Sequence, residues 1–355
     1  MNIVSDWIRR VLTDSQAVVL LVLLFLGLAV IMFMGEMLAP VFAGLVLAYL
    51  LEGPVQYLQQ WRLSRRWAVL IVFAVFSAFL VFLVLGLLPP LSYQLSQLVR
   101  QLPNMVVKGQ DLLMNLPEEY PTFISKQQVT ELIDGIRADV GTLGQYVVSW
   151  SLASVVSLIT LAIYLFLVPL LVFFFLKDKE ALLRWFLSFM PRDYTLSKQV
   201  WHEVDLQMGN YVRGKFIEII IVWSASFLTF TLLGLQFAML LGMMVGLSVI
   251  IPYIGAAVVT IPVALVGLFQ WGFGQDFVWL MIAYAVIQAL DGNVLVPLLF
   301  SEVVDLHPIA IIVAVLVFGG VWGFWGVFFA IPLATVVQAV LKAWPDKTSP
   351  LSNKG

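Results

Sequence analysis

The stretch QALDGNVLVPLLF, residues 288–300, places polar and helix-weakening residues inside an otherwise apolar run. Asp291 carries a carboxyl group that costs about 2.5–3.5 kcal/mol near the centre of a bilayer, even on the lower, insertion-based scale. Asn293 adds an amide, while Gly292 and Pro297 weaken the helix and leave backbone carbonyls available. Together these groups can coordinate an ion or a small polar solute. The alternative interpretation is that the Asp291 carboxyl, protonated or bonded to an asparagine, only fixes the packing of helices.

The composition of the chain places this stretch in a membrane. Hydrophobic residues make up 62% of the 355 residues, charged residues 11%, and the mean hydropathy is +1.01. A soluble domain is closer to half apolar and one quarter charged. A chain this apolar could not hide its surface from water, so we expect it to lie in a lipid bilayer. The net charge of −2 gives no indication of a nucleic-acid partner.

Sequence motifs of catalytic and cofactor-binding sites are missing. The chain has no cysteine, which removes disulfides and thiolate metal sites. It has no H-E-x-x-H, G-x-S-x-G or G-x-x-x-x-G-K-[ST] motif, so zinc proteolysis, serine hydrolysis and ATP binding lack their residues. We therefore predict a protein that is not an enzyme and that holds no cofactor or metal.

Apolar blocks predict an all-α polytopic membrane protein with about eight transmembrane segments. The blocks are roughly 17–35, 37–53, 67–90, 147–176, 216–235, 237–270, 276–300 and 306–341. Glu36, between the first two blocks, predicts a tight hairpin across the membrane. The first block is longer than the apolar core of a signal peptide and no cleavage site follows, so it is predicted to remain as a transmembrane helix. Basic residues cluster before the first block, after the second and fourth, and after the last, which predicts cytoplasmic N- and C-termini.

The same pattern predicts the organisation of the chain. Its parts are 1–90 with transmembrane helices 1–3, 91–146 as an extracytoplasmic amphipathic helical segment, 147–176 as transmembrane helix 4, 177–213 as a cytoplasmic interfacial helical linker, 214–343 as a C-terminal transport unit with an internal repeat, and 344–355 as a cytoplasmic tail. The 91–146 segment is predicted to form two amphipathic helices joined by a proline-containing turn region. The alternative is that it extends the neighbouring spans as helices.

A weak internal repeat marks the C-terminal unit. The sequence GAAVVTIPVAL, residues 255–265, resembles GVFFAIPLATV, residues 326–336. Each ends an overlong apolar block, 237–270 or 306–341, whose middle contains glycine or proline. If each block is a re-entrant hairpin, the two units of the repeat are inverted. If each block spans the membrane, the units are parallel.

The breaks in these two blocks are candidate parts of a solute pathway. The first contains Pro252 and Gly255, and the second contains Gly320 and Gly323. Overlong segments broken at matching positions point to a transporter site. The alternative is that these residues only kink helices or permit close helix packing.

Charged residues are unevenly distributed around this unit. Residues 216–341 contain no Lys or Arg, so we expect no internal cation to pair with their acids, among which Asp291 is the interior candidate. Arg213 in NYVRGK is predicted to anchor a cytoplasmic gate or lipid headgroups. His307 beside Asp305 is predicted to form a pH-sensitive gate, or alternatively only to mark a helix boundary.

Several long motifs resemble one known family. They are LAPVFAGLVLAYLLEGPV (38–55), NYVRGK (210–215), IPYIGA (251–256), ALDGNVLVPLLFSE (289–302), DLHPIAI (305–311) and GGVWGFWGVFFAIPLATV (319–336). On these motifs the chain resembles the AI-2E family of permeases. The resemblance implies a protein of the bacterial inner membrane that forms homo-oligomers and exports autoinducer-2 or exchanges ions and solutes. The Asp-Asn pair typical of the family stands here as Asp291-Gly292-Asn293, which shifts the amide by one residue.

These observations predict an inner-membrane permease that moves a small molecule or ion, coupled to a proton or sodium gradient. The predicted substrate or ion pathway comprises Asp291, Asn293, Pro252, Gly255, Pro297, Gly320 and Gly323, with Arg213, Asp305 and His307 as gate or anchor. The predicted partners are the solute, the lipid bilayer and further copies of the chain. Two alternatives remain: a non-transporting membrane scaffold that holds an envelope partner through 91–146, and a passive channel.

Overall fold

The computed structural model describes residues 15–119, 135, 154–188, 195–252, 254–300 and 306–343. All the elements in these residues are helices, which confirms the predicted all-α fold. In chain order they are α2 (Ser15–Gln60), α3 (Arg65–Phe82), the π-helical turn η1 (Leu83–Leu87), α4 (Leu88–Glu119), α6 (Ser154–Lys177), α7 (Lys179–Leu187), α8 (Thr195–Leu232), α9 (Ala238–Ser248), α10 (Ile254–Trp271), α11 (Gln275–Leu290), the π-helical turn η2 (Asp291–Leu295), α12 (Val296–Phe300), α13 (Pro308–Phe328) and α14 (Ala330–Ala343).

Among the described residues, six helical stretches are long and apolar enough to cross a membrane. They are Met37–Gln60, Arg65–Gly109, Gln207–Leu232, Ile254–Trp271, Gln275–Phe300 and Pro308–Phe328. Two shorter apolar helices, Ala162–Lys177 and Ala238–Ser248, accompany them. A spanning helix needs about 20 residues, so α9 with its 11 residues cannot cross a bilayer alone.

The helix α2 continues through Glu36, so the predicted hairpin at this residue is wrong. Glutamate is a good helix former, and one charge does not interrupt the hydrogen-bond ladder. Pro40 and Pro54 also lie inside the helix. A Cβ atom at Gly35 would collide with the indole of Trp322, so this glycine permits the close approach of α2 and α13.

The long stretch α3–η1–α4 is helical from Arg65 to Glu119, and Pro103 lies inside α4 without ending it. Up to residue 119 the segment continues the neighbouring span as a helix. Residues 120–134 and 136–153, where the second amphipathic helix is predicted, lie outside the described part of the chain. Leu91, Leu98 and Met105 of α4 pack against the buried cluster of α8–α11, so this amphipathic face covers the C-terminal half.

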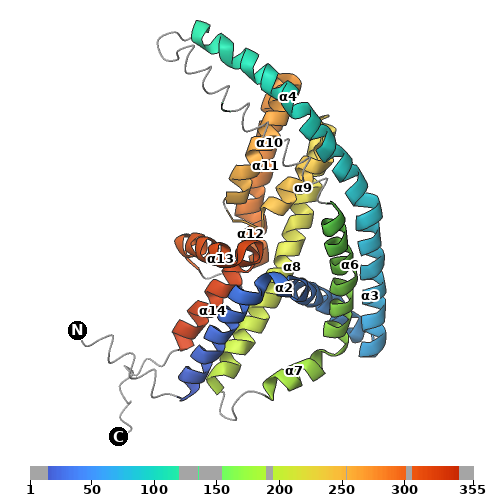
Figure 1. Cartoon of the computed structure of the whole chain (residues 1–355), viewed down its shortest axis with the longest axis vertical. Coiled ribbons are helices and arrows are strands. Elements are labelled where there is room, and N and C mark those ends of the chain that lie inside the picture. The colour runs from blue at the N-terminus through green and yellow to red at the C-terminus, as the bar shows by residue number, and fades with distance from the viewer. Residues whose placement is uncertain are drawn as a thin grey trace, which may run out of the picture.

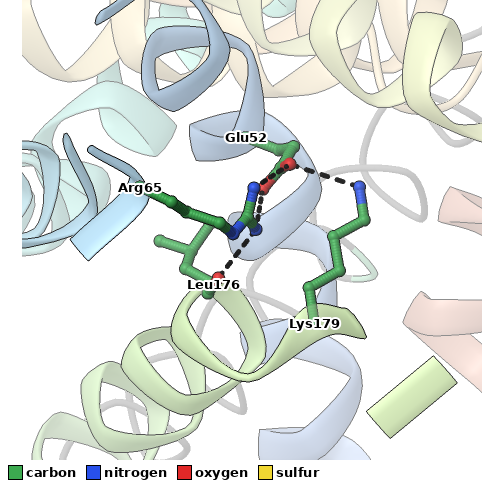
Figure 2. Close-up of polar contacts among 4 residues, drawn as sticks. All are labelled: Glu52, Arg65, Leu176 and Lys179. Atoms are coloured by element: carbon green, nitrogen blue, oxygen red, sulfur yellow. Dashed lines mark hydrogen bonds and ion pairs between the residues drawn. The ribbon is translucent and has the colours of Figure 1, made fainter. Parts of the chain in front are cut away.

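A charged cluster connects the ends of four helices, as Figure 2 shows. Arg65 at the start of α3 donates two hydrogen bonds of 3.1 Å to the Glu52 carboxylate of α2, and one of 2.8 Å to the backbone oxygen of Leu176 in α6. Lys179 at the start of α7 donates to Glu52 at 3.3 Å. The two parallel bonds from one guanidinium fix the relative orientation of α2 and α3.

The C-terminal half contains two helical hairpins at the two predicted breaks, α9–α10 and the segment α13–α14, whose chain reverses at the Gly323 kink inside α13. At Gly255 an added Cβ would collide with the backbone oxygen of Ser248, and at Gly326 with that of Phe318. The chain therefore folds back so sharply that only glycine fits at these two matching repeat positions. In Figure 1, α9, α10 and α11 lie in the upper half, whereas α14 lies in the lower half beside α8.

Candidate functional site

A cavity of about 570 Å³ lies where α8, the two hairpins and the segment α11–η2–α12 meet. Most of its lining is apolar, and the predicted pathway residues Pro252, Pro297 and Asp291 belong to it. The charged groups in the lining are Lys215, Glu218 and Asp291. Elements from both units of the repeat therefore enclose one polar centre.

Asp291 begins the π-helical turn η2 and is only 8% exposed. Both π turns of the described chain end two residues before a proline, Leu87 before Pro89 and Leu295 before Pro297. A proline ring clashes with the carbonyl four residues earlier and cannot bond to it, and a widened turn relieves this clash. Pro297 thus accounts for the local backbone that places Asp291 in the cavity wall.

Two polar atoms in this wall have no hydrogen-bond partner among the described residues. They are Oδ1 of Asp291 and Nε2 of Gln288, one helical turn apart. A buried polar atom without a partner costs about 1–3 kcal/mol. The site therefore offers one acceptor and one donor to a molecule that enters the cavity.

Lys215 provides the cation that the sequence interpretation missed. Its ammonium group donates to Glu218 Oε2 at 2.7 Å and to the backbone oxygen of Val249 at 2.8 Å, and it lies 5.2 Å from the ring centre of Phe300. Lys215 and Glu218 are only 4% and 1% exposed. The expectation that the acids after residue 215 have no cation to pair with is therefore wrong. Lys215 lies one residue before the cation-free stretch. Its spacing of three residues from Glu218 is that of an ion pair within one helix, and this spacing could have indicated the pair from the sequence.

Tyr211 lies on the same face of α8, four residues before Lys215. Its hydroxyl group donates to the backbone oxygen of Phe328 at 3.1 Å, and the side chain lines the cavity. Val249 follows the last residue of α9, and Phe328 is the last residue of α13. One face of α8 therefore bonds to the turn regions of both hairpins.

The remaining predicted pathway residues lie outside the cavity lining. Asn293 is exposed, and its amide donates to the backbone oxygen of Ala289 at 2.8 Å, so it does not pair with Asp291. Gly255 forms the turn of the first hairpin. Gly320 and Gly323 lie near the turn of the second hairpin, and Gly323 has a φ of 57°, in the region that favours glycine.

The two predicted gate residues that the structure describes, Arg213 and His307, are likewise apart from the polar centre. Arg213 donates to Asn210 at 2.8 Å and lies close to Gly53 of α2. His307 precedes α13, where its Nδ1 accepts a 3.3 Å hydrogen bond from the backbone N–H of Ile309. This geometry is that of a helix N-cap, as in the helix-boundary alternative. Asp305 lies outside the described residues.

Comparison with known proteins identifies the family. The model of the AI-2E family transporter matches residues 3–346. The chain belongs to the AI-2E transporter family. It is 49% identical to the permease PerM of Escherichia coli (strain K12) over 346 residues, which cover 98% of each chain. It is also 25% identical to the AI-2 transport protein TqsA of the same strain over 335 residues, 93% of each chain. The transport protein YueF of Bacillus subtilis (strain 168) is 24% identical over 297 residues, 82% of this chain and 80% of YueF.

Membership of the AI-2E family fits the geometry of the molecule. The chain is a multi-pass membrane protein of a transport family, and its relatives are named as permeases and transport proteins rather than enzymes. In this AI-2E member the spanning helices surround a largely apolar cavity with three charged side chains, between two broken segments. Discontinuous helices around a central site are a recurring design of secondary transporters.

Proposed function

We propose that this AI-2E family member carries a small solute across the bacterial inner membrane and binds it in the Asp291 cavity. One observation carries the proposal. Asp291 is 8% exposed, its Oδ1 has no hydrogen-bond partner among the described residues, and it lines a cavity of about 570 Å³. An ionisable residue at membrane depth is expensive and is a functional candidate by default.

The charge balance of the cavity supports coupling to an ion gradient. Lys215 forms a 2.7 Å ion pair with Glu218, which leaves Asp291 as the acid in excess among the three charged lining residues. A proton or a sodium ion can neutralise this carboxylate, and so can a cationic group of the solute. Solute transport is coupled to the ion gradient if the solute and the ion bind Asp291 in turn.

The two hairpins supply the moving parts of an alternating-access cycle. The placement of α9–α10 and α14 in opposite halves of Figure 1 supports the inverted-repeat interpretation, with each hairpin re-entering from its own side. In this proposal the Tyr211 and Lys215 bonds hold the two turn regions against α8, and release of one opens the cavity to one side. Arg213 anchors the cytoplasmic end, both termini are cytoplasmic, and the protein assembles as a homo-oligomer.

The test is a flux measurement on purified protein in liposomes. Uptake of AI-2, the compound in the name of TqsA, would be followed with and without imposed proton and sodium gradients. Asp291→Asn keeps the shape of the side chain and removes its charge. Flux should fall by about tenfold or more, because a charge-assisted hydrogen bond contributes about 1.5–3 kcal/mol.

Asp276→Asn is the matched control, because Asp276 is the exposed acid in the first turn of the same helix α11. Equal fluxes in wild type and Asp291→Asn, with both proteins folded, would remove Asp291 from the mechanism. Flux that is the same with and without the imposed proton and sodium gradients would indicate a passive channel. A folded wild-type protein without flux of AI-2, protons or sodium would favour the scaffold.

A further inference from the structure

A second cavity, of about 270 Å³, lies between α2, α6 and α7 and shares no lining residue with the Asp291 cavity. One face of α2 forms its floor through Leu45, Ala48 and Glu52. The end of α6 and the amphipathic helix α7 form its walls, the latter through Leu182 and Leu183. We call this cavity the α7 groove.

The α7 groove has an apolar body that is open to the surroundings. Leu45, Leu182 and Leu183 line it and remain 39%, 41% and 37% exposed. Exposed leucines in a membrane protein contact lipid without cost, but a groove between helices must be filled by something shaped to enter it. A flexible hydrocarbon chain meets that requirement.

The charged end of the α7 groove carries a net positive charge. Glu52 and Lys179 line it, and Arg65 is bonded to the same Glu52 carboxylate. Within this three-residue cluster, two cations against one carboxylate leave a charge of +1, while Asp178 and Glu180 flank Lys179 along the chain. Figure 2 shows Arg65 and Lys179 approaching Glu52 from two sides.

Lys179 is the cation of this cluster that is available to a further anion. Its ammonium group has three N–H donors, and its hydrogen bond to Glu52 is a long 3.3 Å. The side chain is 36% exposed, against 25% for Arg65. Arg65, in contrast, is committed to both Glu52 oxygens and to Leu176.

The surroundings of the α7 groove match the headgroup level of a bilayer. Trp185 of α7 lines the groove and is 63% exposed, and tryptophan is enriched where membrane meets water. Lys177, the last residue of α6, is exposed beside the α7 groove. Basic residues near a membrane surface attract anionic lipids by about 1 kcal/mol each.

We propose that the α7 groove binds an anionic phospholipid. One acyl chain lies against Leu45, Leu182 and Leu183, and the phosphate group meets Lys179. The net positive end and the apolar body together select an amphiphile with a negative headgroup. This site is independent of the proposed solute site, and the lipid fixes the angle of α7 against α2 and α6.

The experiment uses the full chain in bilayers of phosphatidylcholine, alone or with an equal share of phosphatidylglycerol. Native mass spectrometry would count the phosphatidylglycerol molecules retained after transfer into detergent. Lys179→Ala should weaken retention about fivefold, the factor for one lysine contact of about 1 kcal/mol. Leu182→Trp should abolish it by filling the apolar body without changing any charge.

Arg184→Ala is the matched control, because it removes one cation from the same helix at a residue that does not line the α7 groove. It should retain the lipid as the wild type does, and the unfolding midpoint in phosphatidylcholine alone should show that all variants fold. Equal weakening by Lys179→Ala and Arg184→Ala would overturn the proposal in favour of general surface charge. A change of oligomer mass in Leu182→Trp with unchanged lipid retention would overturn it in favour of a contact between copies.

Discussion

The ammonium group of Lys215 contacts three elements from both units of the repeat. Its partners are Glu218 within α8, the backbone oxygen of Val249 after α9, and the ring of Phe300 in α12. Because the lysine is almost fully buried, its charge depends on these protein partners. The stability of the cavity wall therefore depends on one side chain that lies just outside the cation-free stretch.

Lys215→Met should destabilise the protein far more than the loss of one hydrogen bond would. The substitution leaves Glu218 buried without its cation, and breaking one partner of a buried ion pair costs about 3–5 kcal/mol. The double variant Lys215→Met with Glu218→Leu should recover much of this loss, because an apolar pair of similar volume is often neutral in such a site. The free energy of unfolding in detergent, measured for the wild type, the single variant and the double variant, gives both the loss and the recovery. A double variant that is no more stable than Lys215→Met would contradict this explanation.

At the scale of elements, the two hairpin turns are defined by glycines at matching positions of the repeat. Gly255 lies against the backbone oxygen of Ser248 in the preceding helix α9, and Gly326 lies against that of Phe318 across the Gly323 kink inside α13. A flexible side chain could move aside, but a backbone oxygen that belongs to a helix cannot do so without shifting the helix. The turns are therefore fixed by sterics rather than by side-chain hydrogen bonds.

Gly255→Ala and Gly326→Ala should each separate the helices of their hairpin and lower the unfolding free energy. Overpacking of this kind costs about 1–3 kcal/mol. Gly320→Ala is the control on α13, since an added Cβ there meets nothing within 4 Å. Thermal unfolding of the purified variants should give lower midpoints for Gly255→Ala and Gly326→Ala than for Gly320→Ala. Equal midpoints for Gly326→Ala and Gly320→Ala would refute the steric explanation.

Sequence reasoning located these turns but misjudged others, for physical reasons that differ from case to case. The breaks around Pro252 and Gly323 were predictable because overlong apolar blocks must bend somewhere. Glu36 and Pro103 do not end helices, since a charged helix former continues α2 and α4 remains helical through its proline. The spacing of Lys215 and Glu218 allows an ion pair, but the burial of that pair depends on tertiary packing. The separation of Asn293 from Asp291 depends on the π turn, which residue spacing alone does not reveal.

At the scale of the whole molecule, α8 lies between the two hairpins and bonds to both. Tyr211 donates to Phe328 of the second hairpin, and Lys215 donates to Val249 beside the turn of the first. The two donors are four residues apart on one helix face, so a movement of either hairpin changes contacts on the same surface of α8. Such a shared surface can make opening of one hairpin exclude opening of the other, which is the requirement of alternating access.

Tyr211→Phe should loosen the second hairpin while leaving the first in place. The hydrogen bond removed contributes about 0.5–1.5 kcal/mol, which corresponds to a shift of about two- to tenfold between closed and open states. Because the chain has no cysteine, Ala256→Cys in the cavity wall gives a clean site for a membrane-impermeant thiol reagent. Labelling in liposomes should become about two- to tenfold faster in the Tyr211→Phe background, and only with the reagent on the side of the second hairpin. Faster labelling from both sides would indicate a pore rather than alternating gates, and an unchanged rate would show that the Tyr211 bond does not hold the second hairpin closed.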